Sequence, residues 1–104
     1  MDVYIDDKEL EKLYTTGRSK KLKLPDQVVE KFFALVQKID SAVSIYDFWQ
    51  DSGLNFKKLE GKNKNRYSMR LSGKYRLEMD ITWENEEKTI GIFSLITISN
   101  HYKD

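Results

Sequence analysis

The sequence has no cysteine, and it contains only one proline and one histidine among its 104 residues. Because cysteine is absent, a disulfide framework, a thiolate nucleophile and a zinc–thiolate site are all excluded. No apolar stretch approaches the roughly 20 residues that a membrane-spanning helix needs. The N-terminal residues, MDVYIDDKEL, are acidic and lack the basic start and apolar core of a signal peptide. We therefore expect a cytoplasmic domain with no membrane association.

Positive charge is concentrated in one part of the chain. The 18 Lys and Arg residues nearly balance the 17 Asp and Glu residues, so the net charge is only +1. Residues 57–76, however, read KKLEGKNKNRYSMRLSGKYR and carry eight Lys or Arg against one Glu. Binding to a polyanion such as RNA requires such a concentration. The length and the 39% of apolar residues suit one compact core, so we expect a single domain over residues 1–104.

The first half of the chain has helical patterns. Residues 2–5 are short and alternating and suit an edge strand. Asp6 or Asp7 can then cap a short helix that ends at Gly17. After the proline at position 25, apolar residues recur at steps of three and four up to position 39, which predicts a long amphipathic helix. Ser44 with Asp47 resembles a capping pair and indicates a short third helix or turn.

The second half alternates between apolar and polar residues, which is typical of strands. The alternating segments are residues 54–57, 67–71, 75–81 and 89–99. Residues 72–74 suit a tight hairpin and residues 85–87 a second turn, and the apolar last segment indicates a central strand. The order predicts an α+β fold in which N-terminal helices pack on one face of a small twisted antiparallel β-sheet. The other face would be partly open and basic.

Several short motifs carry a resemblance to a known family. In order along the chain, they are Thr16-Gly17, Leu24-Pro25, the turn from Leu59 to Gly61, the aromatic-Ser-x-Arg pattern from Tyr67 to Arg70, the triplet Tyr75-Arg76-Leu77 and the ending His101-Tyr102. With these motifs the chain resembles the HigB-type toxins of bacterial toxin–antitoxin systems, within the RelE/ParE superfamily. The resemblance implies a RelE/ParE-like fold and a ribosome-dependent endoribonuclease that cuts mRNA during translation.

The resemblance also implies partners. It implies a small helix-turn-helix antitoxin, HigA-like and encoded beside the toxin, which holds the toxin inactive. The complex of the two would repress its own operon, so operator DNA would be contacted only through that complex. The chain departs from the pattern in two places: Lys57 or Lys58 stands where these toxins commonly have a histidine, and His101 precedes Tyr102. The residue that acts as general base therefore stays open.

Cleavage of RNA without a metal needs a base, an acid and cations that stabilise the phosphorane. Arg66 and Arg76 can hold phosphate oxygens through their planar guanidinium groups. His101 titrates near neutral pH and can act as acid or base. Tyr102 can supply a proton or stack on a base, and Lys57 can stabilise charge or, if desolvated, take up a proton. No cluster of Asp, Glu and His has the spacing of a metal site, so we expect neither a metal nor another cofactor.

Further cations are candidates for RNA binding rather than for chemistry. They are Lys58, Lys62, Lys64, Arg70 and Lys74. Each has a simpler interpretation as part of the solvated face of a sheet or loop, and an isolated histidine near a chain end is often a surface residue.

Two other functions remain open. ParE-like relatives share the fold but poison DNA gyrase by binding it, without nuclease activity. The concentrated basic run and the His-Tyr ending favour the nuclease, because a protein that only binds another protein would not need them. A toxin that has lost catalysis and retains only binding is the second alternative.

Overall fold

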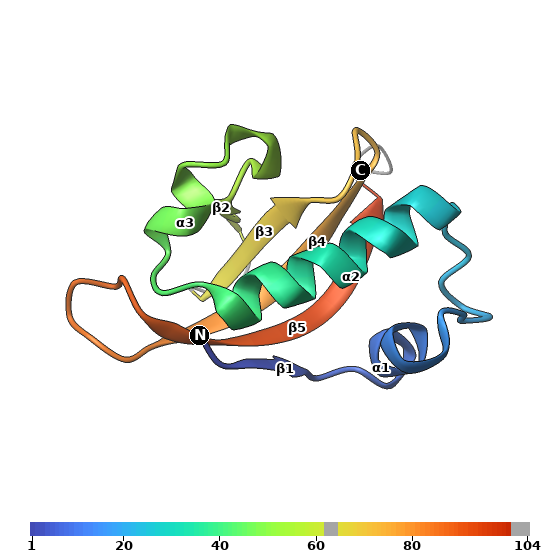
Figure 1. Cartoon of the computed structure of the whole chain (residues 1–104), viewed down its shortest axis with the longest axis horizontal. Helices are drawn as coiled ribbons and strands as arrows, with labels where there is room; N and C mark the ends of the chain where they lie inside the picture. The colour runs from blue at the N-terminus through green and yellow to red at the C-terminus, as the bar shows by residue number, and fades with distance from the viewer. Residues whose placement is uncertain (62–64, 101–104) are drawn as a thin grey trace.

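The computed structural model describes residues 1–61 and 65–100, which form a five-stranded sheet with helices on one face (Figure 1). The elements in chain order are β1 (Val3–Ile5), α1 (Lys8–Thr16), α2 (Asp26–Ser41), α3 (Tyr46–Trp49), the 3₁₀ helix η1 (Ser52–Leu54), β2 (Lys57–Lys58), β3 (Arg66–Arg70), β4 (Tyr75–Trp83) and β5 (Gly91–Asn100). The predicted α+β fold is confirmed. None of the described helices is long and apolar enough to cross a membrane.

The sheet has the strand order β1-β5-β4-β3-β2, and its strands β2 to β5 form the predicted antiparallel meander. As predicted, β5 is an interior strand, with β1 on one side and β4 on the other. The expectation of a wholly antiparallel sheet is wrong for one strand, because β1 runs parallel to β5. The chain leaves β1 through α1 and α2 rather than through a hairpin, so packing of these helices decides the direction of pairing.

Helix α1 begins and ends at the predicted residues. The Asp7 carboxylate accepts hydrogen bonds from the backbone N–H groups of Glu9 and Leu10, at 3.1 and 3.0 Å. Gly17 ends the helix in the left-handed conformation, with φ of +77°, and its N–H donates to the Leu13 carbonyl. A residue with a Cβ would be strained at that φ. Leu10 and Leu13 are fully buried and anchor α1 to the core.

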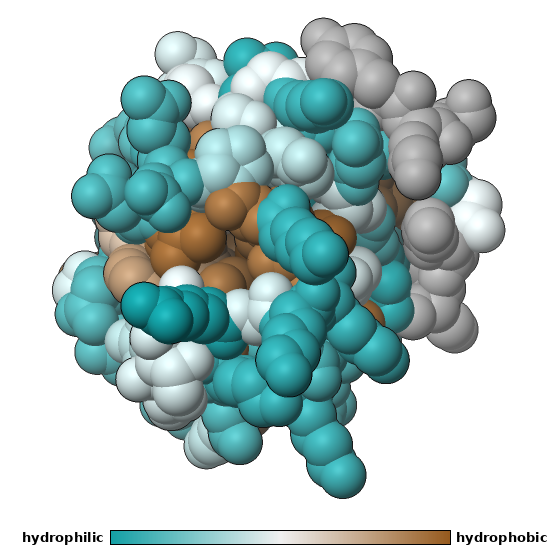
Figure 2. Space-filling view, turned by 90° about the vertical axis from the view of Figure 1, so that its right-hand side faces the viewer, coloured by the Kyte–Doolittle hydropathy of each residue, from teal (hydrophilic) through white to brown (hydrophobic). Residues whose placement is uncertain are grey.

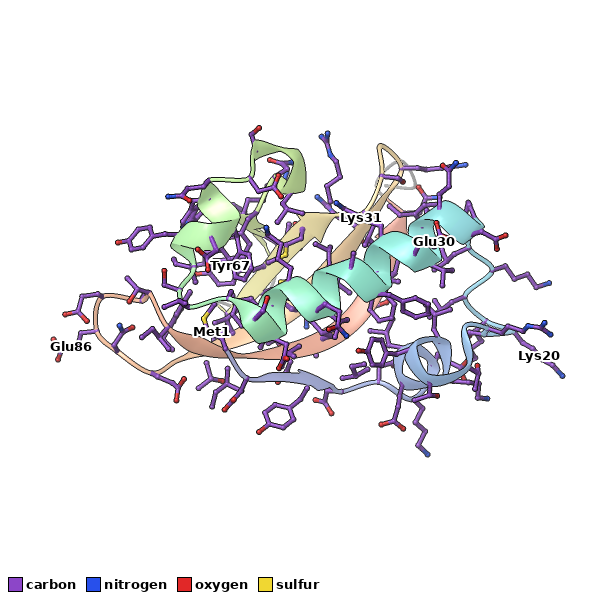
Figure 3. All side chains as sticks on the ribbon, in the orientation of Figure 1. Met1, Lys20, Glu30, Lys31, Tyr67 and Glu86 are labelled. Carbon is purple, nitrogen blue, oxygen red and sulfur yellow. The ribbon has the colours of Figure 1, made fainter. Side chains whose placement is uncertain are left out.

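Helix α2 crosses the sheet and supplies much of the core (Figure 1). Its buried residues are Val28, Phe32, Leu35, Val36 and Ile39, which follow the predicted apolar stripe. The helix ends beside Met1, whose ammonium group donates to the carbonyls of Ile39, Asp40 and Ala42 (Figure 3). These bonds satisfy carbonyls that a helix C-terminus leaves without intrahelical partners, and they fix the start of β1 against α2.

The segment from α3 to β2 differs from the prediction. Residues 54–57 were expected to form a strand, but Leu54 belongs to η1 and only Lys57 and Lys58 pair with β3. The Asp51 carboxylate accepts from the Gly53 N–H, and Asn55 adopts a left-handed φ of +46°. Leu54 is fully buried, so the local turn places an apolar side chain in the core. The strand β2 is shorter than predicted as a result.

The predicted hairpin between β3 and β4 is confirmed. The N–H groups of Leu71 and Ser72 both donate to the Tyr75 carbonyl, and the Ser72 hydroxyl accepts from the N–H groups of Lys74 and Tyr75. The turn fixes the register of the two strands. This register sets which side chains share each face of the sheet.

Candidate active site

The face of the sheet turned away from the helices carries three rows of polar side chains. Residues that are directly paired on neighbouring antiparallel strands point to the same face. The rows are Lys57, Ser68, Glu78 and Thr97; then Arg70, Arg76 and Ser99; then Arg66, Asp80 and Ser94. We call this surface the open face. The intervening residues of β4, Leu77, Met79 and Ile81, are fully buried in the core on the other face.

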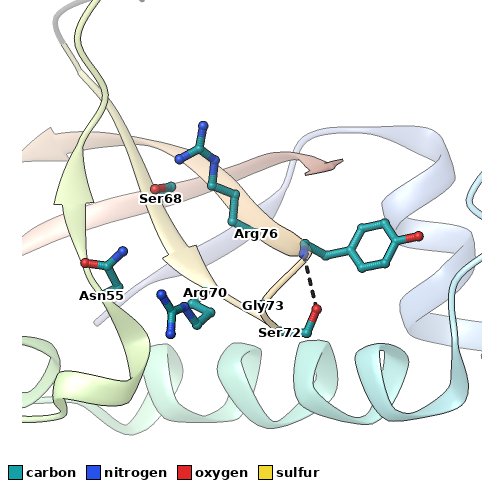
Figure 4. A pocket seen from close by; sticks show the side chains of 7 residues that line it. Asn55, Ser68, Arg70, Ser72, Gly73 and Arg76 are labelled. Atoms are coloured by element: carbon teal, nitrogen blue, oxygen red, sulfur yellow. Dashed lines mark hydrogen bonds between the residues drawn. The ribbon is translucent and has the colours of Figure 1, made fainter. Parts of the chain in front are cut away.

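A small pocket lies on the open face beside the β3–β4 hairpin (Figure 4). It is lined by Asn55, Ser68, Arg70, Ser72, Gly73, Tyr75 and Arg76. Its volume of about 30 Å³ has room for one or two small groups, such as a water molecule or the oxygens of a phosphate, but not for a nucleotide. Neither Arg70 nor Arg76 forms an ion pair with the described part of the chain. The pocket therefore brings together two arginines whose charge is not neutralised by a carboxylate of the described residues.

Arg76 is held in an unusual state. Its Nε atom is buried and has no hydrogen-bond partner within residues 1–61 and 65–100, and the same holds for the Oγ atom of Ser99. These two residues are direct cross-strand partners. A buried donor without an acceptor costs about 1–3 kcal/mol, so native proteins rarely leave one. Both groups are therefore available for a hydrogen bond to an acceptor from outside the described chain.

Arg66 is arranged quite differently, because two carboxylates hold it. Its Nε donates to Asp80 Oδ1 at 2.7 Å and its Nη1 donates to Glu78 Oε1 at 3.1 Å. The hydrogen bond to Asp80 raises the pKa of Arg66 above its ordinary value, against the lowering effect of burial, and Glu78 adds to the rise. A raised pKa adds stability at any pH below the unfolded value, so this network is intact at neutral pH. The predicted phosphate contact of Arg66 has to compete with it.

Two buried polar residues of the open face were not predicted as site residues from the sequence. Glu78 is only 4% exposed and Ser68 only 1%, although both lie on the face without helices. Glu78 stands two residues after Arg76 in an alternating strand, so parity alone places both on one face. That parity was the available signal for Glu78. Its burial and its bond to Arg66 depend on neighbouring strands and had no signal in the sequence.

The other predicted residues are placed as follows. Lys57 lies in the same row as Ser68 and Glu78 on the open face, whereas Lys58 pairs with Tyr67 and points to the opposite face. Lys74 is exposed in the hairpin next to the pocket. The remaining predicted residues, Lys62, Lys64, His101 and Tyr102, lie outside the described residues. Within the described ranges, no group of three His, Asp or Glu residues is arranged to hold a metal ion.

Comparisons with known proteins agree with the fold and with the motifs. A family model described as the RelE-like toxin of the type II toxin–antitoxin system HigB matches residues 4–91. A solved structure, a YoeB/ParE toxin from Agrobacterium tumefaciens, superposes with a TM-score of 0.57 over 98% of this chain and 100% of its own, at 13% sequence identity. That likeness concerns the fold alone. No curated protein matches the chain.

The family match includes the whole basic run of residues 57–76 and ends at Gly91, the first residue of β5. It covers well over half of the sequence, and the resemblance stated from the motifs is confirmed. The chain belongs to the RelE-like HigB toxins of type II toxin–antitoxin systems.

Proposed function

We propose that this toxin is a metal-independent endoribonuclease that cuts mRNA on the translating ribosome and so inhibits translation. The observation that carries the proposal is Arg76, whose buried Nε has no partner within the described chain and which lines the same pocket as Arg70 and Ser68. A phosphate oxygen suits such a donor, because a guanidinium group binds phosphate through charge-assisted hydrogen bonds. Membership of the family supports the same reading.

The reaction we propose needs no group that the chain lacks. A base takes the proton of a ribose 2′-hydroxyl, and the freed oxygen forms a bond to the adjacent phosphorus. The bond from phosphorus to the 5′ oxygen of the next nucleotide breaks, and an acid protonates that oxygen. The products are a 2′,3′-cyclic phosphate and a 5′-hydroxyl. Negative charge grows on the non-bridging oxygens during this step, and the proposed role of Arg76 and Arg70, which line the same pocket, is to stabilise it.

For the proton transfers we propose His101 as acid or base, with Tyr102 as proton donor or stacking group. Asn100, one residue before His101 in the sequence, pairs with Tyr75, which lines the pocket. Lys57 stands in the row of Ser68 and Glu78, two strands from β4. At about 4.8 Å per strand, it lies roughly 10 Å from Glu78 across the sheet. Lys57 therefore suits charge stabilisation at the edge of the site.

Arg66 receives a different task in this proposal. Because it bonds both Glu78 and Asp80, it neutralises two carboxylates that would otherwise repel an RNA phosphate on the same face. We propose Arg66 as a positioning residue. We propose that Arg70 and Lys74 attract the flanking RNA backbone. The same role is proposed for Lys62 and Lys64, only because their side chains are positively charged. Lys58 is the weakest of the proposed RNA contacts, since its strand register turns it to the opposite face.

As a type II toxin, the protein has a cognate antitoxin as its partner. We propose that this antitoxin is a HigA-like helix-turn-helix protein, that the pair binds operator DNA only as a complex, and that the free toxin acts on the ribosome and mRNA in the bacterial cytoplasm.

Primer extension on a reporter mRNA tests the nuclease. The toxin is induced briefly without antitoxin, as wild type, Arg76→Ala, His101→Ala and the control Arg18→Ala, whose arginine is exposed between α1 and α2. Wild type and control should cut at discrete positions that depend on translation, and the other two variants should not cut. Growth arrest with mRNA intact would overturn the proposal, and DNA breaks under those conditions would favour gyrase as the target.

A further inference from the structure

One residue reaches the pocket on the open face from outside the β3–β4 hairpin. We call this pocket, which Arg70 and Arg76 line, the arginine pocket. Its other lining residues lie between Ser68 and Arg76, whereas Asn55 stands in the connection between η1 and β2 (Figure 4). The Asn55 side chain is exposed, and its amide forms no hydrogen bond with the described part of the chain. An available amide therefore lies beside two arginines that have no carboxylate partner among the described residues.

The backbone of Asn55 adopts a conformation that few residue types accept. Its φ of +46° lies in the left-handed region, which glycine and asparagine tolerate best. Asn55 ends η1, and its N–H donates to the Ser52 carbonyl at 3.2 Å. The turn alone is therefore one reason for an asparagine here. Because glycine would serve the turn equally well, the amide and the backbone can be tested separately.

Two buried neighbours hold Asn55 in place. Leu54 is fully buried and Phe56 is 4% exposed, so the chain is anchored in the core on both sides of the exposed amide. The Phe56 ring stacks on Tyr67, with ring centroids 5.5 Å apart, and it also contacts Trp49, at 4.8 Å between centroids. A donor that is fixed in this way loses little entropy on binding, as preorganised stabilisation of a transition state requires.

The lining of the arginine pocket indicates a small anion as its ligand. A larger hollow beside the connection from α1 to α2 is lined in part by Leu13 and Leu22, and Figure 2 shows an apolar area ringed by polar side chains on that side of the molecule. The arginine pocket instead offers two guanidinium groups, serine hydroxyls and the amide of Asn55. Its volume of about 30 Å³ admits the oxygens of one phosphate group. The NH₂ group of an asparagine can donate to such an oxygen.

We propose that Asn55 is a further catalytic residue of the nuclease, whose side-chain amide donates a hydrogen bond to a non-bridging oxygen of the attacked phosphate. The inference rests on the proposed function, since it assumes that the arginine pocket receives an RNA phosphate. As negative charge grows on that oxygen, the hydrogen bond becomes stronger, and Asn55 adds a neutral donor to the charges of Arg70 and Arg76. Its contribution should therefore appear in kcat rather than in KM.

The test measures cleavage of mRNA on programmed ribosomes by the purified full-length toxin. Asn55→Gly removes the amide and keeps the left-handed backbone, whereas Asn55→Asp replaces the donor by a carboxylate and also tolerates this φ. The control is Lys88→Gly, because Lys88 is the second described residue other than glycine with a left-handed φ, at +57°, and lies in the loop between β4 and β5. Thermal unfolding shows whether each variant is folded.

We expect Asn55→Gly to lower kcat roughly 100-fold and to leave KM within about threefold. Asn55→Asp should lose at least as much activity, because its carboxylate repels the phosphate. The control should keep the wild-type kcat. An unchanged kcat in folded Asn55→Gly would overturn the inference and leave Asn55 as a turn residue. A new codon preference with kcat intact would also overturn it, since the amide would then contact a base.

A second measurement does not depend on cleavage. Inorganic phosphate is titrated into isotope-labelled toxin, and the NMR signals of the Asn55 NH₂ group, identified by their loss in Asn55→Gly, are followed together with that of the Arg76 Nε–H. Both should shift, and Arg76→Ala should abolish the shift at Asn55. If only the Arg76 signal moves, the inference is wrong even where the toxin cuts mRNA. If wild type cuts no mRNA but both signals shift, the proposed nuclease fails and the contact of Asn55 with phosphate stands.

Discussion

The two faces of the sheet bury different kinds of residue, and these residues are stabilised in different ways. On the helix side, Leu77 and Met79 of β4 are fully buried among apolar neighbours. Removing these apolar side chains from water is sufficient to stabilise them. On the open face, the buried groups are polar, and each needs a specific partner. Glu78 has one in Arg66, but the Nε of Arg76 has none in the described chain. The apolar groups of the helix side are thus covered within the described chain, whereas the open face keeps a buried donor that has no partner there.

The largest effect on stability is expected on the helix side. Leu77→Ala removes a fully buried side chain from the middle of the core. The lost burial and the cavity should lower the free energy of unfolding by about 2–5 kcal/mol. Urea denaturation of the purified toxin measures this. A loss below about 1 kcal/mol would mean that the helix layer collapses into the space and that the core is less rigid than the packing indicates.

The second effect concerns the one buried ion pair of the described open face. Arg66→Ala leaves Glu78 buried without its cation, and we expect a loss of about 3 kcal/mol in the free energy of unfolding. The double variant Arg66→Ala/Glu78→Gln should regain part of that loss, because the buried Glu78 carboxylate is replaced by a neutral amide. A double-mutant cycle measures the coupling. Strictly additive losses would show that Arg66 and Glu78 are not energetically coupled, since the bond from Arg66 to Asp80 lies outside this cycle.

Arg76→Ala should change the stability of the toxin only slightly and its mRNA cleavage strongly, which distinguishes Arg76 from Leu77 and Arg66. The Arg76 Nε is a buried donor without a partner in the described chain, so its removal sacrifices no hydrogen bond of that atom. The free energy of unfolding should therefore change by less than about 1 kcal/mol. Cleavage of translated mRNA should fall by a factor of about 100 to 1,000 if the guanidinium stabilises the phosphorane. The rate of reporter cleavage and a denaturation curve test both halves. Strong destabilisation with proportionate loss of activity would instead make Arg76 a structural residue.

The smallest effect is expected at an exposed ion pair, which serves as the reference for Arg66. Lys38 Nζ and Asp51 Oδ2 are 3.6 Å apart, with side chains 37% and 42% exposed. Solvent screening limits such pairs, so Lys38→Gln should cost less than about 1 kcal/mol. Denaturation at low and high salt checks this. A loss equal to that of Arg66→Ala would remove the contrast between buried and exposed pairs on which the interpretation of Arg66 depends.

Much of the fold was predictable because its signals are local. Asp7 and Gly17 mark the ends of α1 through a side-chain cap and a left-handed φ, both of which depend on neighbouring residues only. The apolar stripe of α2 and the hairpin at residues 72–74 are local in the same sense. The two-residue β2 was not predictable, because the burial of Leu54 competes with strand pairing and that competition is settled by the core.

The candidate site was predictable only in part. Parity along β3 and β4 is enough to place Arg70 and Arg76 among polar residues of one face. Parity does not say that Arg66 is bonded to Glu78 and Asp80, since these partners come from a strand 12 and 14 residues away. The roles of His101 and Tyr102 remain predictions.

The sequence alone was enough to predict the order of the longer helices and strands, the alternation that separates apolar from polar faces, and the concentration of cations in residues 57–76. These follow from propensity, periodicity and charge, which act over a few residues. The parallel pairing of β1 with β5, and the carboxylate partners that Arg66 has and Arg76 lacks within the described residues, depended on the tertiary structure. Each of these depends on which distant strands and helices become neighbours, and burial of the shared core selects those neighbours.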